Sequence, residues 1–177
     1  MAGSEIIFAG FGGQGILSMG KFLAYAGMDS GHNVSWLPSY GPEMRGGTAN
    51  CSVIVTDENI GSPIVYEASA VVVMNKPSLD KFEKAVVKGG LIVMDSDLID
   101  RMPVRDDVDV IAIPAQKIAE EVGSVKIANM VLLGALIEKT GVVTMEQILD
   151  ALKAHGKEKF YQMNKDALEK GAELAKR

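Results

Sequence analysis

The chain has 177 residues, of which 47% are hydrophobic and 23% charged, values typical of a folded protein with a full core. Its net charge of −5 at pH 7 argues against nucleic acid or an anionic membrane as the main partner. It has no apolar run of membrane-spanning length and no secretory signal pattern, so we expect a cytoplasmic protein. One cysteine excludes an internal disulfide and a cysteine-held iron–sulfur cluster within this chain.

The first predicted element is a short buried strand over residues 6–9, and a helical pattern follows over residues 14–28. Between and around them stand Gly10, Gly12, Gly13, Gln14 and Gly15. Three of the glycines fit the spacing G-x-G-x-x-G in its required strand–turn–helix context. Glycines allow a tight turn whose backbone N–H groups approach an anion, and the helix N-terminus adds partial positive charge. The pattern therefore predicts a phosphate-binding turn.

Two interpretations of this turn remain open, because the glycines also serve simple close packing of strand and helix. A dinucleotide-binding unit has an Asp or Glu at the end of its second strand, which holds the ribose hydroxyls. Here the second predicted strand, residues 33–37, is followed by Pro38, Ser39 and Tyr40, and Asp29 falls near the end of the preceding helix. A free-standing NAD or FAD site is therefore disfavoured.

A long loop is predicted over residues 38–49, where prolines and glycines prevent regular structure. It carries Tyr40, Glu43 and Arg45, and long loops within a domain are usually functional. Arg45 is suited to clamp a phosphate or carboxylate, or else to pair with Glu43. Because the loop leaves the second strand at the edge where the glycine turn lies, we expect the two segments to share one ligand site.

The rest of the chain alternates strands and helices before becoming helical. Strands are predicted at 50–56, 70–74, 91–94 and 108–113, with a short edge segment at 60–65. A helix is predicted from about Pro77 to Val87, and Gly89 and Gly90 break it. Further helices are predicted at 115–122, 126–140, 144–154 and 158–176. Thr144 and Gln147 match a capping box. This order predicts a single α/β domain over residues 1–177: a doubly wound, mostly parallel sheet with the helical C-terminal third packed on it.

Other reactive side chains favour structural interpretations. Cys51 lies in an apolar strand without an activating neighbour, so we expect a buried, unreactive thiol. His32 and His155 are far apart in sequence and are expected at the surface, with no metal-ligand spacing between them. The carboxylates are expected to cap turns rather than to bind Mg²⁺: Asp95, Asp97, Asp100, Asp106 and Asp107. No set of residues forms a catalytic or metal-binding pattern.

Four stretches together resemble the gamma subunit of 2-oxoacid:ferredoxin (or acceptor) oxidoreductases. They are residues 10–17, 39–47, 75–79 and 129–135, with the sequences GFGGQGIL, SYGPEMRGG, NKPSL and NMVLLGA. They occur in the order typical of that subunit, and the resemblance covers essentially the whole chain. The second stretch is more similar to the 2-oxoglutarate and branched-chain enzymes than to the indolepyruvate ones, which favours 2-oxoglutarate as the substrate.

The resemblance implies a subunit of a complex that oxidatively decarboxylates a 2-oxoacid to an acyl-CoA and passes electrons to ferredoxin or another acceptor. Thiamine diphosphate and the iron–sulfur clusters are then held by partner subunits. This chain is expected to contribute to coenzyme A binding and to close the active site. The expected cofactor-binding residues are Gly10, Gly12, Gly13, Gln14, Gly15 and Arg45. Gly12, Gly13, Gln14 and Gly15 are expected to cradle a CoA phosphate, with Arg45 as a second anion contact or a subunit anchor.

Two alternatives belong to other classes of protein. A stand-alone nucleotide-binding or regulatory α/β protein would bind its nucleotide tightly without partners, as a monomer or a simple homodimer. A complete dehydrogenase is disfavoured by the missing acid after the second strand. The subunit hypothesis instead predicts weak CoA binding by the isolated chain and an apolar surface that is free to self-associate.

Overall fold

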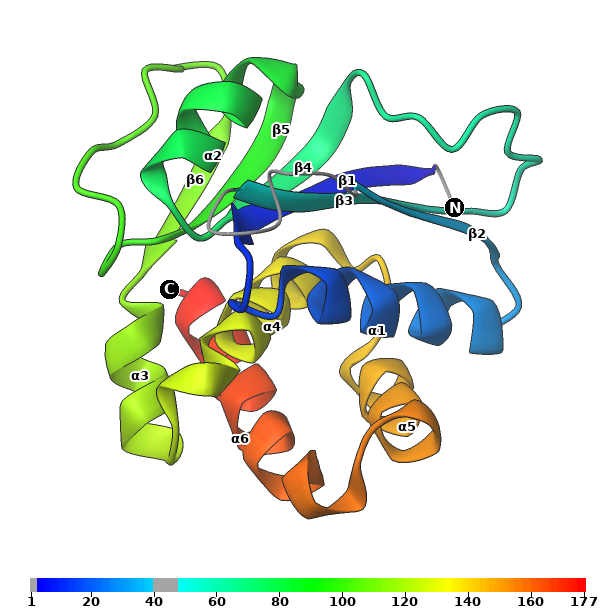
Figure 1. The fold of residues 1–177 in the computed structure, drawn as a ribbon. Coiled ribbons are helices and arrows are strands. Elements are labelled where there is room, and N and C mark those ends of the chain that lie inside the picture. The colour runs from blue at the N-terminus through cyan, green and yellow to red at the C-terminus, as the bar shows by residue number, and fades with distance from the viewer. Residues whose placement is uncertain (1–2, 40–47) are drawn as a thin grey trace.

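The fold is organised around a six-stranded mixed sheet, seen in a computed structural model that describes residues 3–39 and 48–177 (Figure 1). The strands lie in the order β2-β3-β1-β4-β5-β6. Their bounds are β1 Ser4–Phe11, β2 Asn33–Pro38, β3 Thr48–Thr56, β4 Ala68–Val73, β5 Val86–Asp95 and β6 Asp109–Ile113. β1, β4, β5 and β6 pair in parallel, whereas β3 runs antiparallel to both of its neighbours, β1 and β2. The predicted mostly parallel α/β sheet is confirmed, with β3 as its reversed strand.

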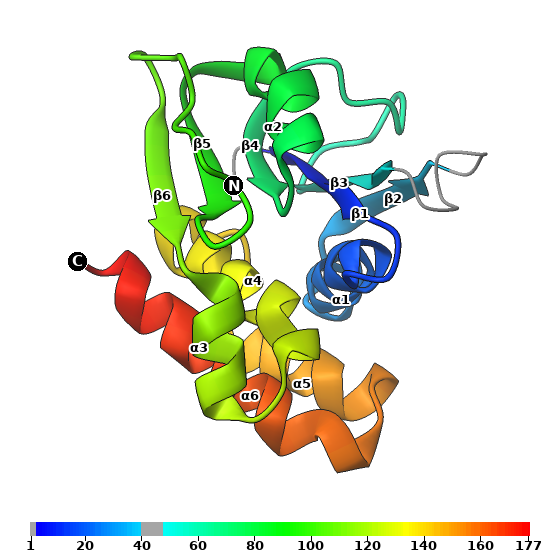
Figure 2. The same ribbon diagram turned by 60° about the vertical axis from the view of Figure 1, so that its left-hand side comes forward.

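Helices cover both faces of this sheet. α2 (Lys76–Phe82) lies on one face, and all the longer helices lie on the other (Figures 1 and 2). The longer helices are α1 Ile16–Asp29, α3 Ala115–Val122, α4 Ala128–Thr140, α5 Met145–His155 and α6 Glu158–Ala175. Alternate β1 residues therefore enter different cores: Ile6 and Phe8 face the larger helical layer, and Ile7 and Ala9 face α2. No described helix is both long enough and apolar enough to cross a membrane.

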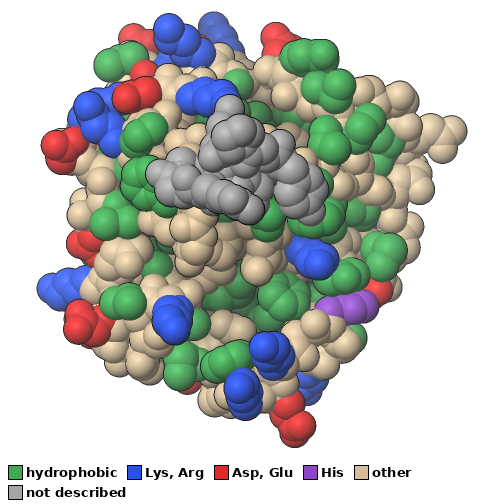
Figure 3. Space-filling model, in the orientation of Figure 1, with side chains coloured by type: hydrophobic (Ala, Val, Ile, Leu, Met, Phe, Trp, Pro, Cys, Tyr) green, Lys and Arg blue, Asp and Glu red, His purple; other side chains and the backbone are tan. Residues whose placement is uncertain are grey.

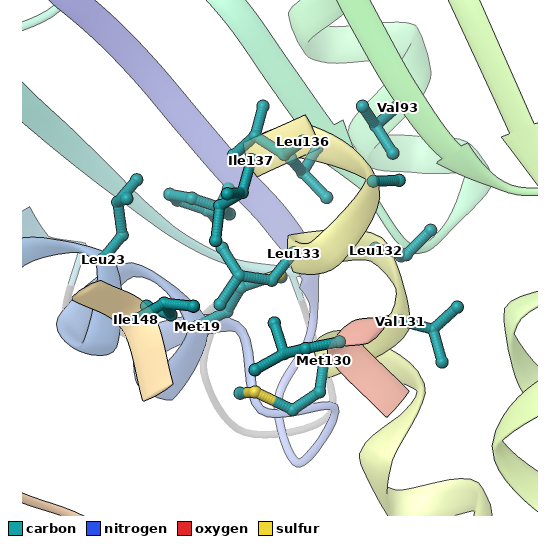
Figure 4. Packing of buried hydrophobic residues seen from close by; sticks show 14 of the residues in the cluster. Met19, Leu23, Val93, Met130, Val131, Leu132, Leu133, Leu136, Ile137 and Ile148 are labelled. Atoms are coloured by element: carbon teal, nitrogen blue, oxygen red, sulfur yellow. The ribbon is translucent and has the colours of Figure 1, made fainter. Parts of the chain in front are cut away.

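α4 forms the centre of the helical layer. Its residues from Ala128 to Ile137 are all buried, which matches its apolar sequence. In Figure 4, Leu133 lies toward Met19 of α1 and Ile148 of α5, while Leu132 lies on the side of Val93 of β5. The predicted packing of the helical C-terminal third on the sheet is confirmed: α4 contacts β4 and β5, and α6 contacts β6.

Two helix termini in this third follow directly from the sequence. Thr144 accepts a hydrogen bond from the Gln147 N–H through its hydroxyl, and the Gln147 side chain accepts one from the Thr144 N–H, so the predicted capping box is confirmed. At the start of α4, a 3₁₀ turn over Val125–Ile127 precedes the helix, and the Ser124 hydroxyl accepts from the Lys126 N–H. The helix predicted from residue 126 therefore begins as a 3₁₀ turn.

Two predictions around β4 and β5 were wrong. The helix expected to reach Val87 ends at Phe82, a 3₁₀ turn follows over Glu83–Ala85, and β5 already begins at Val86. Gly89 and Gly90 do not interrupt regular structure: they lie within β5, where Gly89 has φ +77° and the pairing with β4 shifts register. The short edge segment expected over residues 60–65 is also absent, since residues 57–67 connect β3 to β4 without a strand.

Candidate functional site

The glycine turn joins the carboxyl end of β1 to the first residue of α1. Gly15 is the N-cap of α1, with φ +74°, and it offers no side chain to accept from the first helical N–H groups. Gly13 also has a left-handed backbone, with φ +90°, which L side chains rarely adopt. α1 has 14 residues and no side-chain cap, so its N-terminus carries unpaired N–H donors and partial positive charge. The turn is therefore suited to an anion, as the sequence predicts.

The glycines of the turn serve two different purposes. A Cβ on Gly10 would lie 2.6 Å from the Gln14 side-chain oxygen and 2.7 Å from Ile16, so this glycine is required for packing inside the turn. A Cβ on Gly13 would meet no atom within 4 Å, and both Gly12 and Gly13 are exposed. Gly12 and Gly13 therefore present bare backbone outward, where a ligand can approach.

Gln14 connects the turn to the neighbouring strand rather than pointing away from the protein. Its side-chain oxygen accepts from the Phe11 N–H at 2.6 Å, and its amide nitrogen donates to the Met74 carbonyl, just after β4, at 3.4 Å. The Gln14 N–H in turn donates to the Phe11 carbonyl at 3.3 Å. Gln14 thus holds the shape of the turn, which places it as a positioning residue for any ligand there.

A surface hollow of about 330 Å³ opens over the exposed side of the turn. It is lined by Gly12, Gly13, Gly15, the first turn of α1 as far as Ser18, and Ala49 of β3. No charged side chain lines it among the residues that the structure describes, so backbone N–H groups and the helix dipole supply its attraction for an anion. The hollow leaves room for a phosphate beside Gly13.

The structure does not describe Tyr40, Glu43 or Arg45. For the predicted ligand site shared by the loop and the glycine turn, it therefore shows only the two ends of the loop. Thr48, the first residue of β3, pairs with Phe11, and Pro38 at the end of β2 pairs with Cys51 of β3. The described chain therefore leaves and re-enters the sheet at the edge that carries the glycine turn. A role for Arg45 in the site stays a prediction.

Asn129 is a functional candidate that the sequence reasoning did not single out. It lies in the first turn of α4, is 6% exposed, and donates from Nδ2 to the Gly15 carbonyl at 3.1 Å. Its side chain occupies the space that a Cβ on Gly15 would need, because that Cβ would lie 2.4 Å from Nδ2. The sequence signals were an amide within an otherwise apolar helical run and its place at the start of the stretch 129–135, which resembles the family. Asn129 fixes the α1 N-terminus against α4 and thereby sets the position of the hollow.

The predicted turn capping is seen at Asp95, which accepts from the Asp97 N–H at 3.0 Å, and both carboxylates also contact the start of α3. Asp95 is fully buried and accepts from the N–H of Ala115 at 3.2 Å and from the Gln116 side chain at 2.7 Å, and Asp97 accepts from the N–H of Lys117 at 2.8 Å. These contacts pair the first N–H groups of α3. In the described part of the chain, no three His, Cys, Asp or Glu side chains are grouped so that they would hold a metal ion.

Burial gives Asp95 a distinctive pH dependence, because it raises the pKa of this carboxyl above its usual range despite its hydrogen bonds. The folded state then holds the proton more tightly than the unfolded state. We expect the contribution of Asp95 to the free energy of unfolding to be greatest below the ordinary Asp pKa and to fall as pH rises through the raised pKa. Urea unfolding of wild type and Asp95→Asn, from below the ordinary Asp pKa to above the raised one, measures this contribution. The difference in unfolding free energy between the two proteins should change with pH. A constant difference would contradict a raised pKa for Asp95.

Cys51 and the two histidines have structural surroundings. Cys51 is fully buried in β3, so the expected burial is confirmed, and this burial raises the pKa of its thiol to about 12. His32 contacts Asp57 at 2.6 Å, and His155 contacts Asp29 at 2.9 Å. His155 also stacks on the Tyr25 ring with centroids 3.8 Å apart, which fixes the end of α5 against α1. Both histidines are partly exposed and belong to separate contacts, as expected.

Comparison with known proteins agrees with this architecture over nearly the whole chain. Residues 5–174 match the family model described as pyruvate ferredoxin/flavodoxin oxidoreductase. The ketoisovalerate oxidoreductase subunit VorA of Methanothermobacter marburgensis is 40% identical over 98% of this chain, which spans 37% of that relative's length. The 2-oxoglutarate synthase subunit KorC of Methanocaldococcus jannaschii is 37% identical and is covered over 94% of its length by 97% of this chain.

Two solved structures share the fold. The gamma subunit of a keto/oxoacid ferredoxin oxidoreductase from Geobacter sulfurreducens superposes with a TM-score of 0.86 at 32% identity, covering 97% of this chain and 98% of that one. A 2-oxoglutarate:ferredoxin oxidoreductase from Magnetococcus marinus, with 2-oxoglutarate, coenzyme A and succinyl-CoA bound, gives 0.87 at 27% identity over 98% of this chain and 31% of that one. The chain therefore belongs to the pyruvate ferredoxin/flavodoxin oxidoreductase family and has the fold of its gamma subunit.

Proposed function

We propose that this chain is the gamma subunit of a 2-oxoacid:ferredoxin or acceptor oxidoreductase and that its glycine turn binds a phosphate of coenzyme A. The observation that carries the proposal is the exposed Gly12–Gly13 backbone beside the uncapped N-terminus of α1. The Magnetococcus marinus relative, which shares the fold, has coenzyme A bound. In this proposal the chain holds the co-substrate and closes the active site, while partner subunits perform the reaction.

We assign the iron–sulfur clusters to partner subunits because this chain does not fit a cysteine-held cluster, and we assign thiamine diphosphate to them because the chain belongs to this family. A cluster held by cysteines requires several thiolates, and this chain has one cysteine, whose burial opposes thiolate formation. The VorA and Magnetococcus marinus relatives are much longer than this chain, so in them a matching segment is joined to further sequence. This supports a chain that functions within an assembly rather than a stand-alone nucleotide-binding or regulatory protein.

Two oxoacids are candidates for the complex. We propose 2-oxoglutarate as the substrate, because of the amino-acid sequence of residues 39–47 and because two relatives are named for that substrate. The 40% identity to VorA favours ketoisovalerate as the second candidate. Co-purification of the native chain with larger thiamine- and iron–sulfur-containing chains, followed by an assay with both oxoacids, tests assembly and substrate together. The cytoplasmic location, the single-domain extent and self-association of the isolated chain stay predictions.

Substitution of Gly13 tests the phosphate site in the assembled complex. We expect Gly13→Val to raise the KM for coenzyme A about tenfold, the equivalent of ~1.4 kcal/mol, because the side chain would occupy the anion position. Gly31→Val is the matched control: Gly31 has φ +87° against +90° for Gly13, a Cβ added there would likewise meet no atom within 4 Å, and it lies at the other end of α1. Gly31→Val introduces the same backbone strain far from the proposed phosphate site, so the complex that carries it should keep the wild-type KM for coenzyme A. An unaltered KM in Gly13→Val, with the complex intact, would refute the phosphate site.

A further inference from the structure

A cavity of about 640 Å³ lies within the helical layer, between α1, the start of α4 and the turn that joins α5 to α6. The proposed phosphate site does not use it. Its walls are mostly apolar and include Phe22 of α1, Met130 of α4, and Phe160 and Met163 of α6. In the view of Figure 3, hydrophobic side chains are exposed within a hollow in the lower half of the molecule, with Lys or Arg side chains around it. We call this surface the helical-layer cavity.

Large apolar side chains reach solvent at the margin of the helical-layer cavity. Phe160 is 43% exposed, and Val125, which lies between two residues that line the cavity, is 51% exposed. Exposed apolar side chains that lie together mark a surface on which another protein packs. The lining methionines suit the same purpose, because a flexible thioether adapts to the shape of its partner. The cavity therefore has the lining typical of a groove that receives apolar side chains from a second polypeptide.

The charged side chains at the cavity are cationic. Lys126 and Lys157 line it, and no Asp or Glu is among the described residues that do. The Lys159 Nζ lies 4.9 Å from the centroid of the Phe160 ring, and Glu158 lines a different hollow. None of the three lysines forms an ion pair with another described residue, although the chain has 23 Asp and Glu residues against 18 Lys and Arg. This charge is complementary to a surface that carries carboxylates.

Two polypeptides are candidates for this surface: a second copy of the chain and a partner subunit. A two-fold dimer through this face would place the three lysines of one copy opposite the same three lysines of the other, and such like-charge contacts are costly. The VorA and Magnetococcus marinus relatives contain a segment similar to this chain joined to further sequence, since this chain spans 37% and 31% of their lengths. Both observations favour a partner subunit.

We propose that the helical-layer cavity is the docking site for an acidic segment of a partner subunit. Apolar side chains of that segment enter the cavity, and its Asp or Glu side chains contact Lys126, Lys157 and Lys159. The inference rests on the proposed function, which makes this chain one subunit of a complex. It adds the surface by which the chain is held in that complex and the chemistry of the segment that holds it.

Binding of the purified chain to the remaining subunits of the complex, measured as a Kd at two NaCl concentrations, tests the docking site. We expect Lys126→Glu/Lys157→Glu to raise the Kd about tenfold near 0.1 M salt, because carboxylates then face carboxylates. The effect should shrink near 1 M salt, because the Debye length falls from about 10 Å to about 3 Å. Phe160→Ala should raise the Kd about tenfold at both concentrations, since apolar burial is not a charge interaction that salt screens.

Lys84→Glu/Lys88→Glu is the matched control. These two lysines are also exposed and form no ion pair within the described chain, but they lie in the 3₁₀ turn after α2 and in β5, outside the cavity lining. The control makes the same change in net charge and should keep the wild-type Kd. Equal weakening by both double variants, or wild-type binding by all the variants, would overturn the docking site.

Photo-crosslinking in the assembled complex identifies the occupant without charge reversal. With p-benzoylphenylalanine in place of Phe160, we expect mass spectrometry to find attachment to a partner-subunit peptide that carries Asp or Glu beside apolar residues. Attachment to a second copy of this chain, to a partner peptide without carboxylates, or to no peptide in an intact complex would overturn the proposal. If the wild-type chain does not bind the remaining subunits at all, the proposed function itself fails.

Discussion

Replacing Gly134 or Gly171 with alanine is expected to destabilise the protein more than any other single methyl addition to the helical layer. The two glycines lie where α4 and α6 cross. A Cβ on Gly134 would lie 2.0 Å from the Leu168 carbonyl oxygen, and one on Gly171 would lie 1.8 Å from the Val131 carbonyl oxygen. Both obstacles are backbone atoms, which cannot rotate away as a side chain can. Each alanine therefore requires the two helices to separate.

We expect either variant to lower the free energy of unfolding by about 2–3 kcal/mol, the upper part of the range for overpacking, even though alanine favours a helix by about 1 kcal/mol over glycine. For a domain of this size that corresponds to a fall in Tm of roughly 5–10 °C. The double variant should cost less than the sum, because the separation that accommodates one methyl group makes room for the other.

Urea and thermal unfolding of the purified chain measure these effects, with Gly61→Ala as the control. Gly61 lies in the exposed β3–β4 connection, and a Cβ there would meet nothing within 4 Å, so its stability should stay within about 0.5 kcal/mol of wild type. Wild-type stability in both crossing variants would mean that α4 and α6 are not packed at this distance.

Gly15→Ala is expected to affect both the stability of the chain and its binding of the anion. Two costs combine at this position: the left-handed backbone at φ +74° and the 2.4 Å approach of the new Cβ to Asn129 Nδ2. The backbone term is about 1–2 kcal/mol and the contact term about 1–3 kcal/mol. Movement of Asn129 would also shift the start of α1, so the KM for coenzyme A should rise together with the loss of stability.

A second substitution separates the two costs. Asn129→Ala removes the obstructing side chain and the hydrogen bond to the Gly15 carbonyl. In the Gly15→Ala/Asn129→Ala variant we expect the contact cost to vanish and the backbone cost to remain, so the double variant should be more stable than the sum of the single effects predicts. Full additivity in urea unfolding would show that Asn129 does not obstruct the alanine.

Local sequence signals predicted several elements well. The apolar run before the glycines, the helical period after them and the Thr144–Gln147 capping box each depend on residues within a few positions of one another. The helix predicted as far as Val87 failed for the opposite reason. Burial of Val86 against the α2 face and pairing of β5 with β4 extended the strand backward through two glycines. That pairing is a tertiary effect, which overrides local propensity.

The amino-acid order by itself determined that glycines able to form a tight turn stand between a strand and a helix, because this backbone freedom is a property of glycine itself. It also determined that the chain has one cysteine, too few for an internal disulfide or a cysteine-held iron–sulfur cluster within it. Only the tertiary structure decided that β3 runs antiparallel and that Asn129 reaches across 114 positions to the Gly15 carbonyl. Such contacts depend on how distant helices and strands pack, and no local pattern in the chain records that packing.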